Sequence, residues 1–251
     1  MRRILIAVLL LTSVVTQAQK KPNLVHRGKI KWERKMNMYS YIDDMSKSGN
    51  SGFLEQAKKR IDKYKVDKFV QDFSKEESLY QPEKDGIQEL KMPWINISSE
   101  VNEVYNNFKT EKLIASKEIY DKRILIKDSM KKFQWKIKEE FRNIAGYNCR
   151  RAETIIMDSI WVVAFYSDAI IASGGPESFN GLPGMILGLV MPRLNVTYFA
   201  TDVQPYTDAR RELKPPTKGK EYTNASFTEY LRGNMKRWGG YLQRILWYAT
   251  I

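Results

Sequence analysis

Cysteine and histidine are almost absent from the 251-residue chain, which contains one of each, Cys149 and His26. One cysteine cannot close an internal disulfide, and we predict no disulfide-linked partner either. Structural zinc sites take four ligands, mostly Cys and His, so the chain is too poor in both for such a centre. His26 lies near the end of the chain, where order is low, which argues against a Ser-His or Cys-His pair. We therefore predict no metal, no cofactor and no catalytic residue.

Acidic residues remain as a source of catalytic groups, at Glu139-Glu140, Asp158 and Glu177. Their spacing does not place two carboxylates on opposite sides of a substrate, as acid–base hydrolysis requires. Solvated surface acids are the simpler interpretation. Of the possible functions, an uncharacterised hydrolase is thus the least favoured.

No apolar run reaches the roughly 20 residues that a membrane-spanning helix needs. The N-terminal run, Ile4–Val15, follows Arg2-Arg3 and precedes the small residues of Thr16-Gln17-Ala18. A positive segment, an apolar segment and a small-residue cleavage site are the three parts of a secretory signal peptide. We expect residues 1–18 to be removed. The mature chain, 19–251, is then expected as a single domain in the periplasm or associated with the outer membrane.

Negative charge is in short supply, because 29 Asp and Glu stand against 42 Lys and Arg, a formal net charge of +13. A basic surface favours anionic partners such as phospholipid head groups, acidic glycans or nucleic acid. Export makes nucleic acid the least favoured of these, and we predict no nucleic-acid partner. The alternative interpretation is that the charge only keeps the protein soluble.

Alternating polarity predicts that most of the chain is β-structure. From Gly28, apolar residues at positions 30, 32, 36 and 38 alternate with polar ones, which is typical of an antiparallel strand with one wet face. Further strands are expected in Val66–Tyr80 with a turn at 75–77, in three short segments of 101–126, from Phe133 towards Phe141 up to Gly146, and in a hairpin of 154–157 and 160–166. The strand Ile160–Tyr166 is apolar on both faces and should be central. The predicted fold class is α+β, mainly antiparallel β.

Two segments have helical periodicity instead. Apolar residues three and four apart predict a helix near 53–64 and a C-terminal helix near 226–246, which Gly239-Gly240 interrupts. The aromatic and arginine residues of the C-terminal helix suit packing on a sheet, the commoner role, or a membrane interface. A Pro- and Lys-rich stretch near 212–220 is expected to be an exposed linker.

Glycine is concentrated in the segment Gly174–Leu187, which reads GGPESFNGLPGMIL. Pro183-Gly184 suits the centre of a type II turn, because Pro fixes φ near −65° and Gly tolerates positive φ. We expect Gly181 to allow a close approach of strands. A phosphate-binding loop is disfavoured, because the glycine spacing is wrong and no Lys-Ser/Thr pair follows.

The apolar residues of this segment, Phe179 and Leu182, have two interpretations. Either they are buried against the strand around Trp161–Phe165 and serve the fold, or they form an exposed edge that contacts a partner. Burial of each would stabilise the fold by roughly 1.5–3 kcal/mol. We favour the structural role.

The same segment resembles the signature of the GLPGLI family, exported proteins of Gram-negative envelopes named for this motif. The resemblance extends over Ser78–Tyr80, Phe133–Ile137, Ile144–Ala152 and Val163–Tyr166, with conservative departures at Arg151, Phe165 and Met185. It implies a single curved, open antiparallel sheet, similar to the half barrel of periplasmic lipoprotein carriers, whose concave face holds acyl chains. The motif residues with a structural or recognition role are Gly175, Pro176, Phe179, Gly181, Leu182, Pro183, Gly184, Met185 and Ile186.

Two non-enzymatic functions fit these observations. The first is an exported envelope protein that binds or carries an apolar or amphiphilic ligand such as a lipid. The second is an accessory protein that docks on an outer-membrane receptor or transporter. A carrier should have an enclosed apolar cavity of roughly 300 Å³ or more, whereas a docking protein should have a filled core and an exposed apolar patch.

Cys149 also has two interpretations. A lone cysteine on a predicted strand is most often a buried small hydrophobe. The neighbouring Arg150 and Arg151 could instead lower its pKa and make it a reactive thiolate. We favour the buried interpretation.

Overall fold

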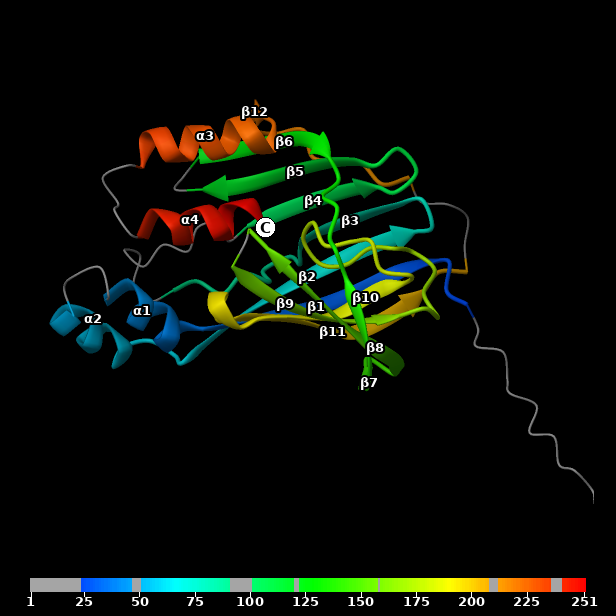
Figure 1. The fold of residues 1–251 in the computed structure, drawn as a ribbon, viewed down its shortest axis with the longest axis horizontal. Helices are drawn as coiled ribbons and strands as arrows, with labels where there is room; N and C mark the ends of the chain where they lie inside the picture. The colour runs from blue at the N-terminus through cyan, green and yellow to red at the C-terminus, as the bar shows by residue number, and fades with distance from the viewer. Residues whose placement is uncertain are drawn as a thin grey trace, which may run out of the picture.

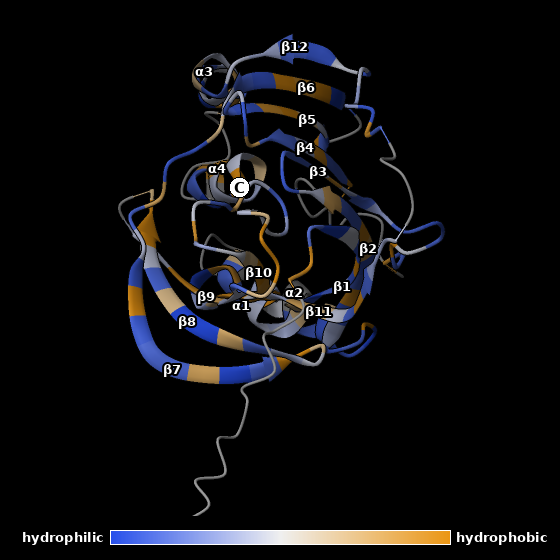
Figure 2. Ribbon diagram, turned by 90° about the vertical axis from the view of Figure 1, so that its right-hand side faces the viewer, coloured by the Kyte–Doolittle hydropathy of each residue, from blue (hydrophilic) through white to orange (hydrophobic). Residues whose placement is uncertain are grey.

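The structure is a computed structural model that describes residues 24–46, 51–90, 101–119, 122–157, 159–207, 212–235 and 241–251. The predicted signal peptide lies outside the described residues. Twelve strands form one sheet in the order β12-β6-β5-β4-β3-β2-β1-β11-β10-β9-β8-β7. Neighbouring strands are antiparallel except for the β12–β6 pair. The sheet curves strongly and does not close (Figure 2), which confirms the predicted fold class.

The sheet consists of two consecutive meanders that meet at β1 and β11 (Figure 1). The first comprises β1 (Arg27–Asn37), β2 (Tyr64–Ser74), β3 (Glu77–Pro82), β4 (Asn102–Asn107), β5 (Lys112–Ile119) and β6 (Lys122–Ser129). The second comprises β7 (Lys136–Ile144), β8 (Tyr147–Ile156), β9 (Ile160–Ser167), β10 (Met185–Met191) and β11 (Val196–Pro205), with the 3₁₀ turn η1 (Pro192–Leu194) between the last two. Strand β12 (Lys220–Tyr222) follows the predicted linker and extends the edge at β6.

Strand β1 shows how the sequence pattern becomes a buried face. Its burial alternates residue by residue, with Ile30, Trp32 and Met36 directed into the core. The three predicted strands of 101–126 and the hairpins that join β2 to β3 and β8 to β9 are also observed. Strand β9 is central as expected, between β8 and β10, and all its residues except Trp161 are buried.

The predicted alternation from Phe133 is only partly a strand, because β7 begins at Lys136. Phe133 stacks on Phe179 with ring centroids 5.1 Å apart, and the indole Nε1 of Trp135 donates to the Asn180 carbonyl at 2.8 Å. These aromatic side chains are therefore held by the Gly174–Leu187 segment and not by a neighbouring strand. The run ends as predicted at Gly146, where Ala145 and Gly146 both have positive φ, 49° and 84°, as a two-residue hairpin turn requires.

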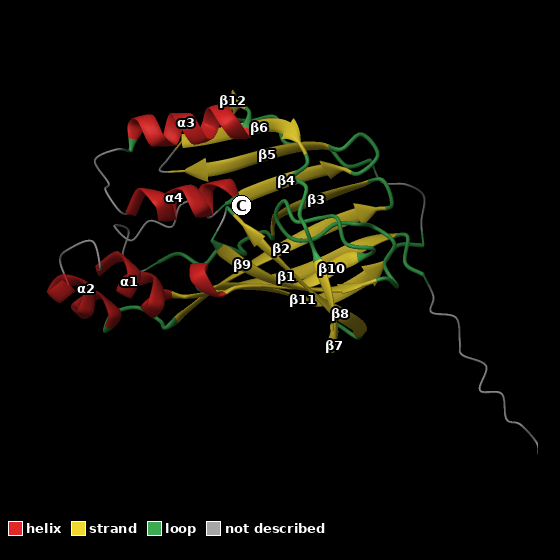
Figure 3. Ribbon diagram, viewed as in Figure 1, coloured by secondary structure: helices red, strands yellow, loops and turns green. Residues whose placement is uncertain are grey.

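Four helices complete the described part of the fold (Figure 3): α1 (Met38–Ser46), α2 (Ser51–Lys58), α3 (Asn224–Asn234) and α4 (Tyr241–Thr250). The helix predicted near 53–64 is the shorter α2, which ends at Lys58 because the chain must extend before β2 begins at Tyr64. Helix α1 was not predicted; the Asn37 side chain accepts a hydrogen bond from the Ser40 N–H at its start, which is the N-cap arrangement.

The predicted C-terminal helix is observed as α3 and α4. Thr223 and Ser226 form a reciprocal capping box at the start of α3, which fixes where that helix begins. Helix α4 lies inside the curve of the sheet (Figure 2), and its Leu246, Trp247 and Tyr248 are buried. This packing fits the sheet-packing interpretation of the helix. No helix of the described segments is long and apolar enough to cross a membrane.

Candidate functional site

The Gly174–Leu187 segment connects β9 to β10 across the inside of the sheet. Phe179 is 1% exposed and Leu182 is 2% exposed, so both are buried, as the structural interpretation expects. Gly181 and Pro183 are the exposed positions of the motif, while Met185 and Ile186 begin β10 in the core. The Gly175 carbonyl accepts a hydrogen bond of 2.8 Å from the Gln71 side chain on β2. The segment is therefore anchored to both meanders.

The turn at Pro183 is tighter than the predicted type II turn. The Gly184 N–H donates to the Leu182 carbonyl at 2.8 Å, which closes a three-residue turn around Pro183. Gly184 has φ of 150°, and a Cβ there would lie 2.7 Å from the Ser167 carbonyl carbon. Glycine is therefore needed for close approach at position 184. Gly181 has φ of 89°, but no backbone atom lies near the position that a Cβ would take. Its positive φ therefore accounts for the glycine, and the close approach of strands that we expected at this position is not observed.

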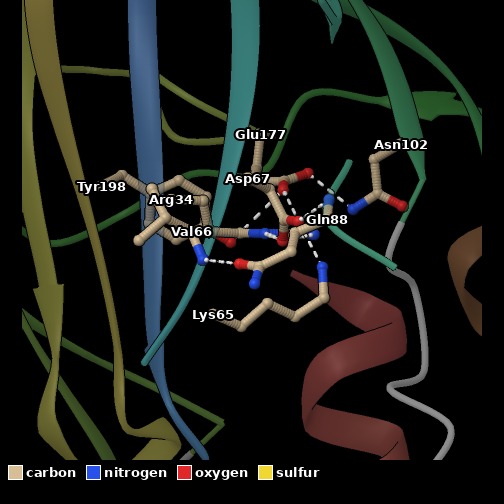
Figure 4. A network of polar contacts seen from close by, with 8 residues as sticks. All are labelled: Arg34, Lys65, Val66, Asp67, Gln88, Asn102, Glu177 and Tyr198. Atoms are coloured by element: carbon tan, nitrogen blue, oxygen red, sulfur yellow. Dashed lines mark hydrogen bonds and ion pairs between the residues drawn. The ribbon is translucent and has the colours of Figure 1, made fainter. Parts of the chain in front are cut away.

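Glu177 stands in the same segment and was interpreted from the sequence as a surface acid, which is wrong. Its side chain is 1% exposed, and its backbone has φ of 53°. Its Oε2 accepts a hydrogen bond of 2.8 Å from Asn102 on β4, and its Oε1 accepts one of 3.3 Å from the Tyr198 hydroxyl on β11 (Figure 4). A buried non-glycine residue with positive φ indicates a conformation that the surrounding contacts hold in place.

Arg34 and Asp67 extend this buried network across β1 and β2 (Figure 4). The Arg34 guanidinium donates to Asp67 Oδ2 through Nη2 at 2.9 Å and Nε at 3.2 Å, and its Nη1 lies 3.9 Å from Glu177 Oε1. Lys65 pairs with the other Asp67 oxygen, which also accepts the Gln88 N–H at 2.9 Å. Two cations thus face two carboxylates, all almost fully buried.

The network is closely packed. A cavity of about 10 Å³ adjoins Arg34, Asn102, Glu177 and Tyr198, which is space for one water molecule at most. Burial opposes the charge on Arg34, but the nearby carboxylates, above all Asp67, raise its pKa. Burial and the neighbouring Glu177 raise the pKa of Tyr198 and of Tyr80 well above the ordinary value. Arg34 therefore stays charged and the two phenols stay neutral at neutral pH, and the small cavity has no room for a substrate.

A larger cleft lies on the other side of the motif segment. Its volume is about 850 Å³, and it is partly open to solvent. It is bounded by the 131–134 segment, the end of β8 with the turn that leads to β9, and helices α3 and α4. Its apolar wall consists of Phe133, Ile155, Ile156, Met157, Phe179, Leu246, Trp247 and Ile251. The motif segment therefore contributes Glu177 to the buried network and Phe179 to the cleft.

The charged side chains that line the cleft are all basic: Lys131, Lys132 and Arg232. No acidic side chain lines it among the residues that the structure describes. Lys131 is the least exposed of the three, and its Nζ donates to the Thr250 carbonyl at the end of α4. Burial and then repulsion from Lys117 lower the pKa of Lys131 to about 7, although Asp128 opposes this.

Lys117 on β5 reaches the same end of α4. Its Nζ donates to the Ala249 carbonyl at 3.3 Å and to the main-chain oxygen of Ile251. Lysines commonly bind the last carbonyls of a helix, where the helix dipole is negative. Burial nevertheless lowers the pKa of Lys117, with Glu177 opposing. Two lysines close to one another in a poorly solvated place leave this end of the molecule rich in positive charge.

The remaining predicted residues lie elsewhere. Cys149 is fully buried, and burial raises the pKa of its thiol to about 12, so the reactive interpretation is not supported. Glu139 and Glu140 are exposed on β7 and pair with Arg150 and Arg151. Asp158 lies outside the described residues. The described segments contain no cluster of three His, Cys, Asp or Glu side chains suited to a metal.

Large apolar side chains are exposed at two places on strands β7, β8 and β9. Ile155 on β8 and Trp161 on β9 lie opposite each other and are 66% and 44% exposed. Ile137 and Phe141 on the edge strand β7 are 43% and 54% exposed. A docking protein is expected to expose such residues.

Sequence reasoning named Glu177 and Phe179 but missed the other charged residues of both sites. Arg34 occupies the buried row of β1 between Trp32 and Met36, and Asp67 shares the buried row of β2 with Phe69. A charged residue in an apolar row is a signal that could have identified the network, because such a charge needs a buried partner. Lys131 carries no comparable signal, since its environment is formed by α4, which lies far along the sequence.

Comparisons with known proteins bear on the fold alone. No protein-family model and no curated protein matches the chain. Structures of PNGF-II in two crystal forms are similar to it, with TM-scores of 0.53 and 0.51 at 14% sequence identity. The similarity covers 81% of this chain but 32% of PNGF-II, so this chain spans about a third of that protein.

Proposed function

We propose that the protein is an exported, non-enzymatic envelope protein of the GLPGLI type that binds or carries an amphiphilic ligand. The observation that carries this proposal is the cleft of about 850 Å³ beside α4. Ligand sites are concave, mostly apolar and furnished with a few polar groups, and they commonly measure 300–1,000 Å³. The cleft combines eight apolar side chains with three basic ones, as an amphiphile with an apolar chain and a polar end requires.

The cleft is partly open, whereas the sequence-based expectation was an enclosed cavity. An open cleft suits a ligand that leaves part of its surface in solvent and exchanges with another acceptor. The closely packed network around Glu177 does not provide a second site of this size. The motif segment then lies between the two, with Glu177 in the buried network and Phe179 in contact with the ligand.

A titration with N-phenyl-1-naphthylamine, a neutral apolar fluorescent probe, tests this proposal. We expect saturable binding of one probe per protein and displacement by long-chain lipids. Gln243 lines the cleft from an exposed position on α4, so Gln243→Trp should fill part of it and weaken binding at least severalfold. Glu229→Trp, at an exposed position of α3 outside the cleft, is the matched control. Absence of saturable binding to the wild-type protein would contradict the proposal.

Export has a separate test. Intact mass of the protein from an envelope fraction should correspond to a chain that begins at Gln19, after removal of residues 1–18. A mature form that still begins at Met1 would contradict export by signal-peptide cleavage.

The docking function has its own supporting observation, the exposed pair Ile155 and Trp161. If this pair contacts an outer-membrane protein, Trp161→Ser, at a position outside the cleft lining, should remove a co-purifying membrane protein, and Ile137→Ser on the edge strand should not. Native mass spectrometry of protein from its own host detects bound lipid and bound protein in one measurement. Lipid without protein favours the carrier function, and protein without lipid favours docking.

A further inference from the structure

We infer that the amphiphile bound in this cleft carries an anionic head group, a phosphate ester or a carboxylate, and that Lys131 binds it as an ammonium ion with uptake of a proton. The inference rests on the proposed function, because it names the chemistry of the ligand in the same cleft. Its basis is the distribution of charge along the cleft wall.

The cleft has three basic side chains and, in its described lining, no Asp or Glu side chain. Lys132 is well solvated, with its side chain 80% exposed and an ion pair to Glu111 at 3.3 Å, and Arg232 is exposed on α3. Lys131 differs because it is partly buried beside Phe133 and Phe179. An anion placed there would gain a charge-assisted hydrogen bond in a poorly solvated place, where such bonds are strongest.

Lys131 has the hydrogen-bonding capacity for this role. An ammonium group has three N–H donors, and the Thr250 carbonyl accepts one of them. Among the described residues no second acceptor binds the ammonium group, which leaves two donors for a ligand oxygen. The stacked rings of Phe133 and Phe179 and the Trp247 side chain continue the wall from this point. Head group and chain therefore have adjoining places in one cleft.

The groups that face Lys131 do not neutralise it over the physiological pH range. Lys117 approaches from β5, Arg232 from α3 and Lys132 from the same segment, and all three are basic. Helix α4 contributes uncharged groups to the cleft, and so do the described ends of β8 and β9. Asp128 at the end of β6 is the one acid that acts on Lys131 in the described structure. Burial opposes its ionisation, but hydrogen bonds from Asn224 and Ser129 outweigh this and lower its pKa, so Asp128 does not titrate with Lys131.

The direction of the pH effect follows from the pKa of Lys131 in the free protein, about 7. An adjacent anion favours the ammonium form and raises this pKa in the complex. At pH 8 the free lysine is mostly neutral, so binding takes up close to one proton; at pH 6 it is already charged, and uptake is near zero. By linkage, an anionic amphiphile should bind roughly tenfold more weakly at pH 8 than at pH 6.

Lysophosphatidylglycerol below its micellar concentration is the probe, because its phosphodiester keeps one negative charge from pH 6 to pH 8. Monoacylglycerol with the same acyl chain is the neutral control, and glycerophosphoglycerol and inorganic phosphate supply the anion without a chain. Isothermal titration calorimetry in buffers of different ionisation enthalpy measures both affinity and proton uptake. We expect uptake of nearly one proton at pH 8 for lysophosphatidylglycerol and of none for monoacylglycerol.

Variants separate Lys131 from its neighbours. Lys131→Gln should abolish proton uptake and the pH dependence, while Lys132→Gln, which changes an exposed lysine of the same cleft, should preserve both. Lys131→Arg keeps a permanent charge, so it should bind the lysolipid equally well at pH 6 and pH 8. This second variant decides the matter if Lys131→Gln does not fold.

The outcomes distinguish the inference from the proposed function. Equal binding of lysophosphatidylglycerol and monoacylglycerol without proton uptake overturns the inference and leaves the proposed function intact. Binding of glycerophosphoglycerol or phosphate as tightly as the lysolipid also overturns it, because the site would then recognise an anion without a chain. If no probe with an acyl chain binds, the proposed function fails as well.

Discussion

The motif segment separates two groups of charged side chains that differ in balance. In the buried network, Arg34 and Lys65 are matched by Asp67 and Glu177, and the space between them is filled. In the cleft, Lys131, Lys132 and Arg232 adjoin about 850 Å³ of open space with no acidic side chain in the described lining, although Glu111 outside the cleft pairs with Lys132. Lys131 is partly buried, as the network is, but only the network holds buried carboxylates against its cations. We therefore interpret the network as part of the folded core and the cleft as the proposed site for an anionic ligand.

The largest expected effect on stability comes from removing a charge from the buried network. Asp67→Asn leaves Arg34 and Lys65 buried without their carboxylate, so we expect the free energy of unfolding to fall by about 3–5 kcal/mol. Urea or guanidinium unfolding measures it. The matched control is Glu221→Gln, which breaks an exposed pair with Lys127 and should cost about 0–1 kcal/mol. A loss as small as that for Asp67→Asn would show that the network contributes little to stability.

A second test asks whether Leu182 contributes to the stability of the fold or to binding. Leu182 is 2% exposed and does not line the cleft, so Leu182→Ala should lower stability by about 2–5 kcal/mol. Ligand binding per folded molecule should be unchanged. An unaltered melting temperature together with lost partner binding would instead identify the segment as a recognition edge.

Substitutions at two glycines of the motif segment should lower stability to different extents, because the backbone is constrained differently at each. Gly184→Ala should cost about 1–3 kcal/mol, because it combines positive φ with a clash on the Ser167 carbonyl. Gly181→Ala should cost about 1 kcal/mol, because only its φ is unfavourable to a side chain. Pro183→Ala should cost less still, since it mainly frees the unfolded chain. Thermal melts of the three variants give the order, and a reversed order for the two glycines would contradict the close-approach argument.

One small expected effect has the opposite sign. Lys131→Met removes a desolvated charge and should stabilise the ligand-free protein by about 1 kcal/mol at pH 6, after loss of the Thr250 hydrogen bond. The folded pKa of Lys131, about 7, lies below that of an unfolded lysine. The unfolded state therefore binds more protons above pH 7, and the cost of Lys131 fades as pH rises. Unfolding at pH 6 and pH 9 should show the advantage of the variant shrinking; an advantage that grows with pH would contradict this.

Sequence patterns predicted the sheet better than the sites within it. The alternation of β1 and the three strands of 101–126 were readable because each reports which residues face a core, a local property of the chain. The same reasoning failed at Phe133 and Trp135, whose alternation reflects contacts with the motif segment and not with a strand. Arg34 shows a second limit: its place in the buried row of β1 could have indicated its burial, but the identity of its partners depends on strand order.

The cleft could not be predicted from the sequence for a related reason. Its walls come from residues between positions 131 and 251 that are brought together by α3, α4 and the end of the β8–β9 hairpin. Lys131 and Lys132 are identical in type and adjacent in sequence, yet one is partly buried and the other is solvated. Only the placement of α4 distinguishes them.

The arrangement of the sheet as two meanders has a consequence for how the chain folds. Within each meander every strand pairs with its neighbour in sequence, so those contacts close short loops and form quickly. The two meanders are joined by β1 and β11, where Gly28 lies opposite Pro205 and Met36 opposite Val196. This seam closes the longest loop in the sheet, and its entropy is lost before its contacts are gained. Assembly of the seam is therefore the step that should limit the rate of folding, and until β11 arrives one edge of β1 has no partner strand.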